Sequence, residues 1–311
     1  MSQWFDDKFE RENIRKYTRK RLSPGYMGFI RKLSITNWLI IVNIIVFIFM
    51  FLFGQIFGTA VSDQIINLFA LQANSFFSGQ FWTVFTSMFM HANFIHLFVN
   101  MFSLFFLGNF VERIIGRKRL FWMYIISGIF AGLFFVVLSY SLGSVCIVNF
   151  LGGCLGAKIF TSPNTVAVGA SGAIFALAGL LVILTPKNKV YLIGGPLIAI
   201  ILEAILFGIF PNATFGSAID AIFTVYIIFS IFAMFSFNRT IRKIALPLEM
   251  RFWLLPFIAI IPLVIIGLFV TLPIGNMAHL GGLFAGMIYA FYLKMKYKKK
   301  TEMINKMFSP K

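Results

Sequence analysis

Two residues of this chain have the side chains of a nucleophile and its general base. Ser171 lies among small residues in Gly169-Ala-Ser-Gly172, where a polar loop passes into an apolar segment. His279, one of only three histidines, opens another apolar segment. A serine hydroxyl is a weak nucleophile until a base takes its proton, and histidine is the usual base because its pKa lies near neutral pH. Together, the two residues predict acyl-transfer chemistry on a serine hydroxyl.

Each residue also has a purely structural interpretation. Small residues around Ser171 let membrane helices pack closely, and for the serine taken alone this is the commoner explanation. A histidine inside a membrane span is costly and is a functional candidate by default, although His279 could instead bond a neighbouring helix. Gly282 and Gly286, four apart on one helix face, provide a second surface of small residues. Two such surfaces could bring their spans close enough for a Ser–His hydrogen bond.

A second pair of polar residues is suited to stabilise an oxyanion. His96 and Asn100 are four apart, so they share one face of a helix. Both side chains can donate hydrogen bonds. Such donors stabilise the carbonyl oxygen that becomes negative when a serine attacks the carbonyl carbon. An amide bond between helices is the alternative for Asn100 and, for this residue alone, the commoner one.

The sequence places no acidic residue as a third partner of His279. Among the ten acidic residues, Glu203 and Asp220 lie in or near predicted spans, and Asp63 lies in a connection. A Ser–His dyad is therefore predicted rather than a triad. The chain lacks a His-Glu-x-x-His motif, and its three histidines are not spaced as metal ligands, so no metal or cofactor is expected.

The composition predicts that these residues are held by membrane-spanning helices. The chain has 311 residues, of which 59% are hydrophobic and 12% charged, with a mean hydropathy of +0.90. Soluble domains carry roughly a quarter charged residues, and about 20 apolar residues cross a bilayer as a helix. The segments are apolar all round, which excludes the alternating pattern of a β-barrel. Spans are predicted at about 36–56, 91–111, 120–142, 169–185, 190–210, 217–237, 252–272 and 276–295.

Positive charge alternates between the predicted connections. All but one of the 27 Lys and Arg residues lie in the terminal segments or in the turns 112–119, 186–189 and 238–251. The exception is Lys158. By the positive-inside rule, both termini are cytoplasmic. The net charge of +17 then comes from residues on one side of the membrane, so no nucleic acid partner is expected.

This orientation brings the candidate residues to one side of the membrane. His96, Ser171 and His279 open spans that all run from outside to inside, so they lie at a similar depth below the outer face. The fourth predicted span would form a helix of roughly 25 Å at about 1.5 Å per residue, which is shorter than a hydrocarbon core of about 30 Å. Ser171 is therefore expected at the floor of a polar depression that water can enter.

The charge pattern also divides the chain. We predict a basic cytoplasmic segment 1–35, a transmembrane domain 36–296 and a basic cytoplasmic tail 297–311. The first segment is long, polar and mixed in charge, unlike a signal peptide, and suits an anchor at an anionic membrane surface. Cys146 and Cys154 share one outer connection, where a disulfide and two free thiols both remain open.

The chain resembles the rhomboid family of intramembrane serine proteases in several motifs, which follow the family's order. The motifs are His91-Ala-Asn-Phe-Ile-His96-Leu-Phe-Val-Asn100, Leu107-Gly108 with Val111-Glu-Arg113 and Gly116, Gly169-Ala-Ser171-Gly172, and Ala278-His279-Leu-Gly-Gly282. The similarity extends over the pattern of spans and loops from about 36 to 296. It implies an all-α, polytopic membrane fold with a rhomboid-like six-helix core.

The resemblance also implies a role for each matching position. Ser171 is similar to the family's nucleophile and His279 to its general base. His96 and Asn100, with the backbone N–H of Ser171, are similar to the group that stabilises the oxyanion. Two further positions are implied to be structural, namely His91 and Glu112.

Two positions depart from the pattern of some relatives. Phe175, one turn after the nucleophile, stands where some relatives have tyrosine, so its ring can stack on His279 but offers no hydroxyl. Trp82-Thr83 stands where some relatives have Trp-Arg, so the loop contact made by that arginine is not expected here.

The chain is also longer than the common core. Between Ser171 and His279 there is room for three spans, where the six-helix core has one. We assign an extra transmembrane hairpin to about 187–240, which gives about eight spans in total. Adding a pair of spans keeps the fourth and last spans parallel, so the dyad is retained.

The sequence therefore predicts an intramembrane serine endopeptidase that cleaves near the outer membrane face with a Ser–His dyad. Its partners would be the lipid bilayer and single-span or other transmembrane protein substrates, and its location the cell membrane, as a multi-pass protein. One alternative is a catalytically silent rhomboid-like protein that binds membrane clients, although such relatives typically lose the serine or the histidine. The other is a transporter that uses Glu203 and Asp220, although no matching pair of broken helices is visible.

Overall fold

The computed structural model describes residues 33–146, 149–150, 153–154, 159–209, 216–267 and 275–307. Almost all of the proposed N-terminal segment 1–35 therefore lies outside the described residues, as does the end of the tail. The described residues are mainly helical, and the prediction of an all-α polytopic membrane protein is confirmed. Four helices are long and apolar enough to cross a membrane, namely Ile35–Phe57, Phe94–Ile115, Arg117–Leu142 and Gly216–Ala233.

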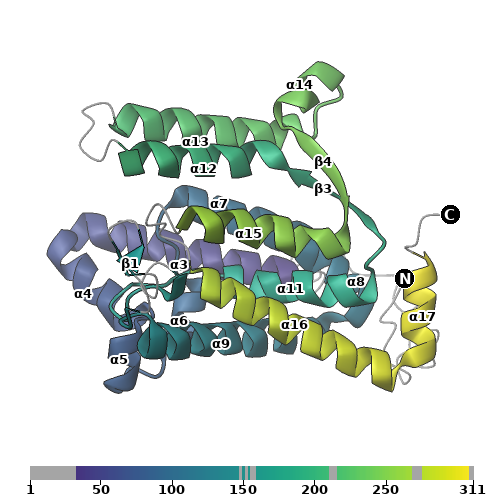
Figure 1. Ribbon diagram of the computed structural model, residues 1–311, viewed down its shortest axis with the longest axis horizontal. Helices are drawn as coiled ribbons and strands as arrows, with labels where there is room; N and C mark the ends of the chain where they lie inside the picture. Colours follow the sequence, from purple (N-terminus) through teal and green to yellow (C-terminus); the bar gives the residue numbers. More distant parts are fainter. Residues whose placement is uncertain are drawn as a thin grey trace, which may run out of the picture.

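Each predicted span corresponds to an apolar helix in the described part of the chain, and several of these helices are short. Their bounds are α3 (Ile35–Phe57), α7 (Phe94–Ser103) with the π-helical turn η2 (Leu104–Gly108) and α8 (Asn109–Ile115), α9 (Arg117–Leu142), α11 (Ser171–Leu184), α12 (Gly194–Ile209), α13 (Gly216–Ala233), α15 (Leu255–Gly267) and α16 (Asn276–Lys296). Figure 1 shows most of them side by side along the long axis of the molecule.

Three predicted boundaries were wrong for identifiable physical reasons. The second span begins at Phe94 rather than at 91, because the side chain of Asn93 caps α7 and accepts a hydrogen bond from the His96 N–H at 2.8 Å. The fourth begins two residues after Gly169, whose φ of +127° is incompatible with a helix. The predicted turn 112–119 is nearly all helical, since only Gly116, with φ +87°, separates α8 from α9.

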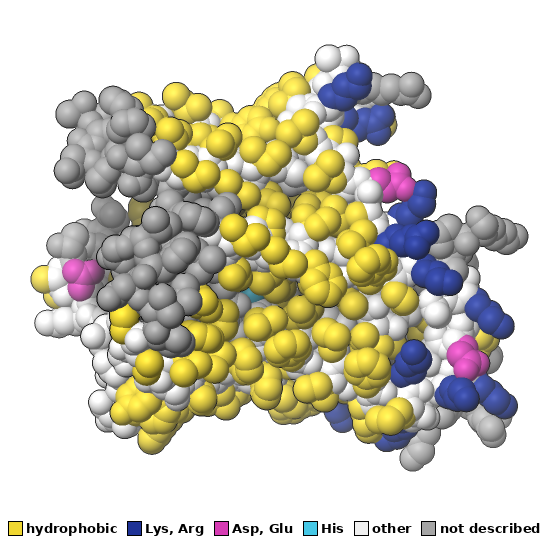
Figure 2. Space-filling view, viewed as in Figure 1, with side chains coloured by type: hydrophobic (Ala, Val, Ile, Leu, Met, Phe, Trp, Pro, Cys, Tyr) yellow, Lys and Arg dark blue, Asp and Glu magenta, His cyan; other side chains and the backbone are white. Residues whose placement is uncertain are grey.

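The Lys and Arg side chains gather at one end of the molecule, which we call the basic end (Figure 2). Helix α16 reaches this end with Lys294 and Lys296 in its last turn, and Lys187 and Lys189 follow the last residues of α11. Helices α11 and α16 therefore run in the same direction, and their first turns lie away from the basic end.

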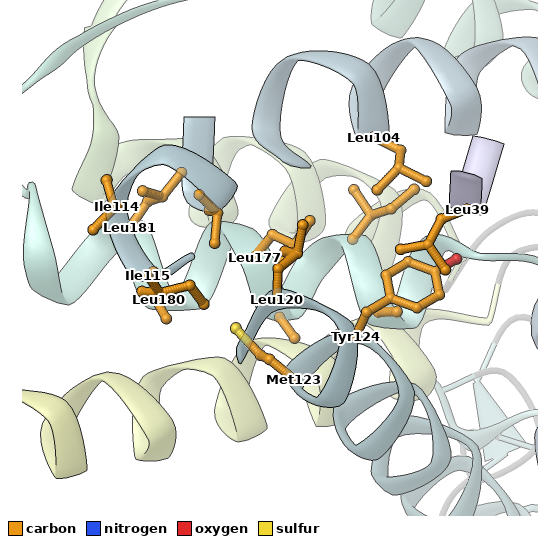
Figure 3. Close-up of a cluster of buried hydrophobic side chains, with 14 of the residues drawn as sticks. Leu39, Leu104, Ile114, Ile115, Leu120, Met123, Tyr124, Leu177, Leu180 and Leu181 are labelled. Atoms are coloured by element: carbon orange, nitrogen blue, oxygen red, sulfur yellow. The ribbon is translucent and has the colours of Figure 1, made fainter. Parts of the chain in front are cut away.

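The core is apolar and surrounds α11. Figure 3 shows side chains from α3, η2, α8, α9 and α11 meeting in one cluster. Leu177, Leu180 and Leu181 on α11 are fully buried, as is Leu120 on α9. Large apolar side chains on the outside of the helices are exposed over the middle of the molecule, as expected for a surface that faces lipid (Figure 2).

Glu112, implied to be structural, caps the start of α3. Its carboxylate accepts hydrogen bonds from the backbone N–H groups of Ile35 (3.1 Å) and Thr36 (2.9 Å) and from the Thr36 hydroxyl (2.7 Å). These N–H groups have no partner within their own helix, and a negative charge is favourable at a helix N-terminus. One carboxylate thus ties the end of the second span to the start of the first.

The connection between the first two spans also shapes the loop before Ser171. It contains short helices, namely α4 (Thr59–Phe69), α5 (Ala73–Phe77), α6 (Thr83–Thr86) and η1 (Ser87–Phe89). Leu71 and Ala167 exchange backbone hydrogen bonds at 2.8 and 3.1 Å, and the Gly169 N–H donates to the Ser87 carbonyl at 2.9 Å. Thr83 is buried and donates to the Gln80 carbonyl at 2.6 Å. This connection therefore fixes the backbone two residues before the candidate nucleophile.

Most of the proposed extra hairpin, about 187–240, lies between two paired strands that the sequence analysis did not predict. The first strand takes up the start of the span predicted at 190–210, so that helix begins at Gly194. Strands β3 (Lys189–Ile193) and β4 (Pro247–Arg251) are antiparallel, and Lys189 forms an ion pair with Glu249 at 2.5 Å. Between them lie α12, α13 and the short α14 (Arg239–Ile244), and after β4 the 3-10 turn η3 (Phe252–Leu254) leads into α15. In Figure 1, α12 and α13 form a layer beyond α7 and α15.

Aromatic side chains join this layer to the second span. The ring centroids of Phe98 on α7 and Phe232 on α13 lie 6.2 Å apart, and those of Phe102 and Phe235 lie 6.0 Å apart. The contact is made by the face of α7 that carries Phe98 and Phe102, whereas His96 and Asn100 lie on a different face.

Two further elements lie outside the spans. A short antiparallel pair, β1 (Asn149–Phe150) and β2 (Gly153–Cys154), follows α9. Cys146 is disulfide-bonded, so the alternative of two free thiols was wrong. Helix α17 (Lys298–Met307), in the segment predicted as a tail, runs across the basic end (Figure 1).

Candidate active site

Ser171 and His279 lie in contact in the folded chain. Ser171 is the first residue of α11, and His279 lies in the first turn of α16. The Oγ atom of Ser171 lies 2.7 Å from Nε2 of His279, across 108 positions of sequence. Both side chains are half-buried. A contact at this distance allows the proton of the serine hydroxyl to pass to the imidazole.

Glycines bring the two helices close enough for this contact. A Cβ atom on Gly282 of α16 would overlap the carbonyl oxygen of Gly172, and a Cβ on Gly286 would overlap that of Ala176. In the opposite direction, a Cβ on Gly179 of α11 would overlap the Leu283 carbonyl. The backbones of α11 and α16 therefore touch directly, as small residues permit in membranes.

The imidazole of His279 is held by an aromatic ring rather than by an acid. Phe175, one turn along α11, stacks on it with ring centroids 4.5 Å apart and planes 17° apart. The other ring nitrogen, Nδ1, is buried and has no hydrogen-bond partner among the described residues. In this part of the chain the arrangement is a serine, a histidine and a stacked phenyl ring, without a carboxylate.

His96 and Asn100 lie over the loop that precedes Ser171. A Cβ atom on Gly169 would lie 2.9 Å from Cε1 and Nε2 of His96 and 3.7 Å from Nδ2 of Asn100. Asn100 is buried, and its amide donates to the His96 carbonyl at 3.0 Å, which leaves its second N–H for another acceptor. Gly169 is thus required twice, once for its positive φ and once for the space that His96 fills.

Backbone donors lie beside the serine as well. Ser171, Gly172 and Ala173 are the first residues of α11, and the N–H groups of a first helical turn have no partner within the helix. The positive end of the helix dipole adds to their attraction for a negative oxygen. Side-chain and backbone donors therefore approach Ser171 from two elements, α7 and α11.

Sequence reasoning missed one part of this arrangement. It did not identify the Ser87 carbonyl, which accepts from Gly169, because nothing in a Thr-Ser-Met segment indicates a contact so far along the chain. His91, implied to be structural, packs its ring edge-on against that of His96, with ring centroids 5.2 Å apart. Glu203 and Asp220, the acids of the transporter alternative, contact each other between α12 and α13 and lie on helices that do not carry the dyad. In the described part of the chain, no cluster of His, Cys, Asp and Glu is suited to a metal ion.

Comparison with known proteins gives the same family as the motifs. The profile of the Rhomboid domain family matches residues 78–225 and 220–296, well over half of the chain. The chain is 31% identical over 157 residues to the rhomboid protease AarA of Providencia stuartii, covering 49% of this chain and 50% of that protein. It is 27% identical over 171 residues to the mitochondrial RHOMBOID-like protein 12 of Arabidopsis thaliana, covering 54% of this chain and 47% of that protein.

A protein named as inactive is also similar. The chain is 32% identical over 80 residues to the inactive RHOMBOID-like protein 8 of Arabidopsis thaliana, covering 26% of this chain and 23% of that protein. The chain thus spans half or less of the length of each of these relatives. The family profile, by contrast, extends across both helices of the serine–histidine pair. The chain belongs to the rhomboid family of membrane proteins.

Proposed function

We propose that this protein is an intramembrane serine endopeptidase that hydrolyses peptide bonds of membrane-spanning proteins. The observation that carries the proposal is the 2.7 Å contact between Ser171 Oγ and His279 Nε2, at the start of two closely packed helices. Family membership supports intramembrane proteolysis at the level of the family, and the Ser–His pair supplies the chemistry.

In the proposed reaction, Ser171 is the nucleophile and His279 is the general base. The Oγ atom attacks the carbonyl carbon of the scissile bond while its proton passes to Nε2 of His279. The same nitrogen then gives that proton to the leaving amine, which departs and leaves an ester on Ser171. A water molecule, deprotonated by His279, attacks the ester, and release of the carboxylic acid restores both side chains.

His96, Asn100 and the first N–H groups of α11 would stabilise the negative oxygen of each tetrahedral intermediate. The positions of His96 and Asn100 over Gly169 support this role, since Gly169 precedes Ser171 by two residues. Donors fixed in advance by a helix cost little reorganisation when the charge develops. Phe175 would keep the imidazole plane in place by stacking.

In the proposed orientation, the basic end and both termini lie on the cytoplasmic side of the cell membrane. The dyad then lies near the outer face of that membrane. Helix α11 has 14 residues, or roughly 21 Å at 1.5 Å per residue, so Ser171 would lie below the surface of a core of about 30 Å. The substrate would be a transmembrane helix unwound near its outer end, because an intact helix keeps its carbonyl groups in its own hydrogen bonds.

Covalent labelling tests the nucleophile independently of any natural substrate. A fluorophosphonate probe is expected to label purified wild type at Ser171, with the serine oxygen displacing fluoride, as peptide mapping would show. Ser171→Ala is expected to remain unlabelled while unfolding at the same temperature as wild type. Equal labelling of the alanine variant would exclude Ser171 as the nucleophile. If folded wild type neither labels nor cleaves, the silent client-binding protein becomes the better assignment.

Asn100→Ala is expected to lower kcat by about 10² with little change in KM, the usual cost of losing one oxyanion donor. The change is checked by initial rates on a single-span test substrate. Asn109→Ala is the matched control, because Asn109 also donates to the carbonyl four residues earlier (2.7 Å, to Phe105) but lies in α8, at the other end of this span. Unchanged kcat in Asn100→Ala would remove this residue from the oxyanion group.

A further inference from the structure

A cavity at the basic end is not explained by the proposed protease activity. It has a volume of about 340 Å³ and lies where α11 and α16 end and α17 begins. Its lining includes residues of all three helices, so one ligand could touch both helices of the dyad at the ends far from Ser171 and His279. The volume lies within the range of about 300–1,000 Å³ that is usual for small-molecule sites.

The cavity has an apolar part formed by two helices. Ile183 and Leu184 come from the last turn of α11, and Phe291 and Met295 from the last turns of α16. Phe291 and Met295 are 48% and 78% exposed, so the protein leaves much of each side chain uncovered. An apolar surface open at this level suits a hydrocarbon chain of the bilayer.

The polar part of the cavity carries two lysine side chains, those of Lys294 and Lys298. Their ammonium groups make no hydrogen bond or ion pair with any described residue. Two neighbouring lysines differ, because Lys296 donates to the Tyr292 hydroxyl at 2.8 Å and Lys300 lies 5.9 Å from the centre of the Tyr297 ring. The ammonium groups at the cavity are thus free to bind an anion, whereas those beside it are already engaged.

The junction between α16 and α17 fixes the helices that carry Lys294 and Lys298. Arg119 donates to the Tyr297 hydroxyl at 3.1 Å, and its guanidinium carbon lies 5.3 Å from the centre of that ring. Thr301 and Ile304 of α17 are buried against the body of the protein. Helix α17 is therefore docked on the body of the protein, which holds its side of the cavity in place.

We propose that this cavity binds an anionic phospholipid. The phosphate would lie between Lys294 and Lys298, and an acyl chain would follow Phe291 and Met295 toward the membrane. Glu302 also lines the cavity and would repel a bare multivalent anion, but it can accept a hydrogen bond from a headgroup hydroxyl. This combination favours a singly charged headgroup with hydroxyl donors, such as phosphatidylglycerol, over free phosphate. The proposal does not rest on protease activity.

Binding is tested with purified full-length protein in a neutral detergent. Phosphatidylglycerol, phosphatidylcholine and inorganic phosphate are added separately. Native mass spectrometry measures the retained lipid, and tryptophan fluorescence measures the unfolding temperature. Phosphatidylglycerol is expected to remain bound and to raise the unfolding temperature, because a ligand that binds only the folded state stabilises it. Phosphatidylcholine and inorganic phosphate are expected to have much smaller effects.

Paired variants separate the cavity from the general positive charge of this surface. Lys294→Gln with Lys298→Gln is expected to weaken phosphatidylglycerol binding about 25-fold, from roughly a fivefold loss for each lysine near a headgroup. Lys299→Gln with Lys306→Gln removes the same charge outside the cavity and is expected to bind like wild type. Equal losses in both pairs, or equal stabilisation by phosphatidylcholine, would overturn the proposal. Stabilisation by inorganic phosphate equal to that by phosphatidylglycerol would overturn the lipid assignment.

Discussion

Replacing His279 by alanine is expected to lower kcat/KM for a transmembrane substrate by about 10³-fold or more, because among the described residues His279 is the one side chain hydrogen-bonded to the Ser171 hydroxyl. Labelling of Ser171 by a fluorophosphonate should fall to a similar extent, since that reaction needs the same proton acceptor. Both rates can be measured on one preparation, with the unfolding temperature as the check on folding.

His279→Gln is the stricter companion of the alanine variant. Glutamine keeps a hydrogen-bonding side chain of comparable size beside Ser171 and Phe175, but its amide is not a base at neutral pH. We expect this variant to be as inactive as the alanine variant. Substantial activity in the glutamine variant would mean that His279 positions Ser171 by a hydrogen bond and does not take its proton.

A second large effect is expected for Gly282→Ala, a change of one methyl group outside the reacting atoms. The new Cβ would overlap the Gly172 carbonyl, which belongs to the backbone of α11 and cannot rotate away as a side chain would. Separating the helices should cost about 1–3 kcal/mol in the free energy of unfolding, and it would lengthen the contact between Ser171 and His279. We expect a lower unfolding temperature and a loss of fluorophosphonate labelling together.

Gly275→Ala is the matched control for Gly282→Ala. Gly275 precedes the same helix with φ −76°, and a Cβ there would meet only the Ala278 side chain, at an ordinary 3.7 Å. This variant is expected to have the unfolding temperature and the fluorophosphonate labelling of wild type. If Gly282→Ala behaved in the same way, the close packing of α11 on α16 would not be what holds the dyad together.

Much of the fold could be predicted from the sequence because lipid imposes simple rules. Long apolar runs mark helices, and the Lys and Arg residues between them mark one side of the membrane. For the same reason Ser171, His279 and His96 could be placed at one level before any contact was known. The preference of small residues for close helix contacts likewise indicated that Gly282 and Gly286 would face another span.

Other features depend on contacts that the local sequence does not encode. Helix α11 begins at Ser171 because Gly169 adopts φ +127° under His96 and bonds Ser87, and these partners come from distant segments. The strand Lys189–Ile193 is short and adjoins an apolar run, where strand and helix cannot be separated by periodicity. Helix α17 lies in a lysine-rich segment, which is typical of a solvated tail, and it is held by the burial of two side chains.

The most direct measurement of the central claim uses purified wild type and Ser171→Ala with one single-span test substrate, analysed by intact mass. The proposed mechanism predicts two product masses from wild type that add up to the substrate plus one water, with the cut within or beside the end of the span nearest Ser171. It predicts no cleavage by Ser171→Ala. Cleavage that persisted in the alanine variant, or cuts by wild type far from the span, would contradict the assignment of Ser171 as the nucleophile of an intramembrane protease.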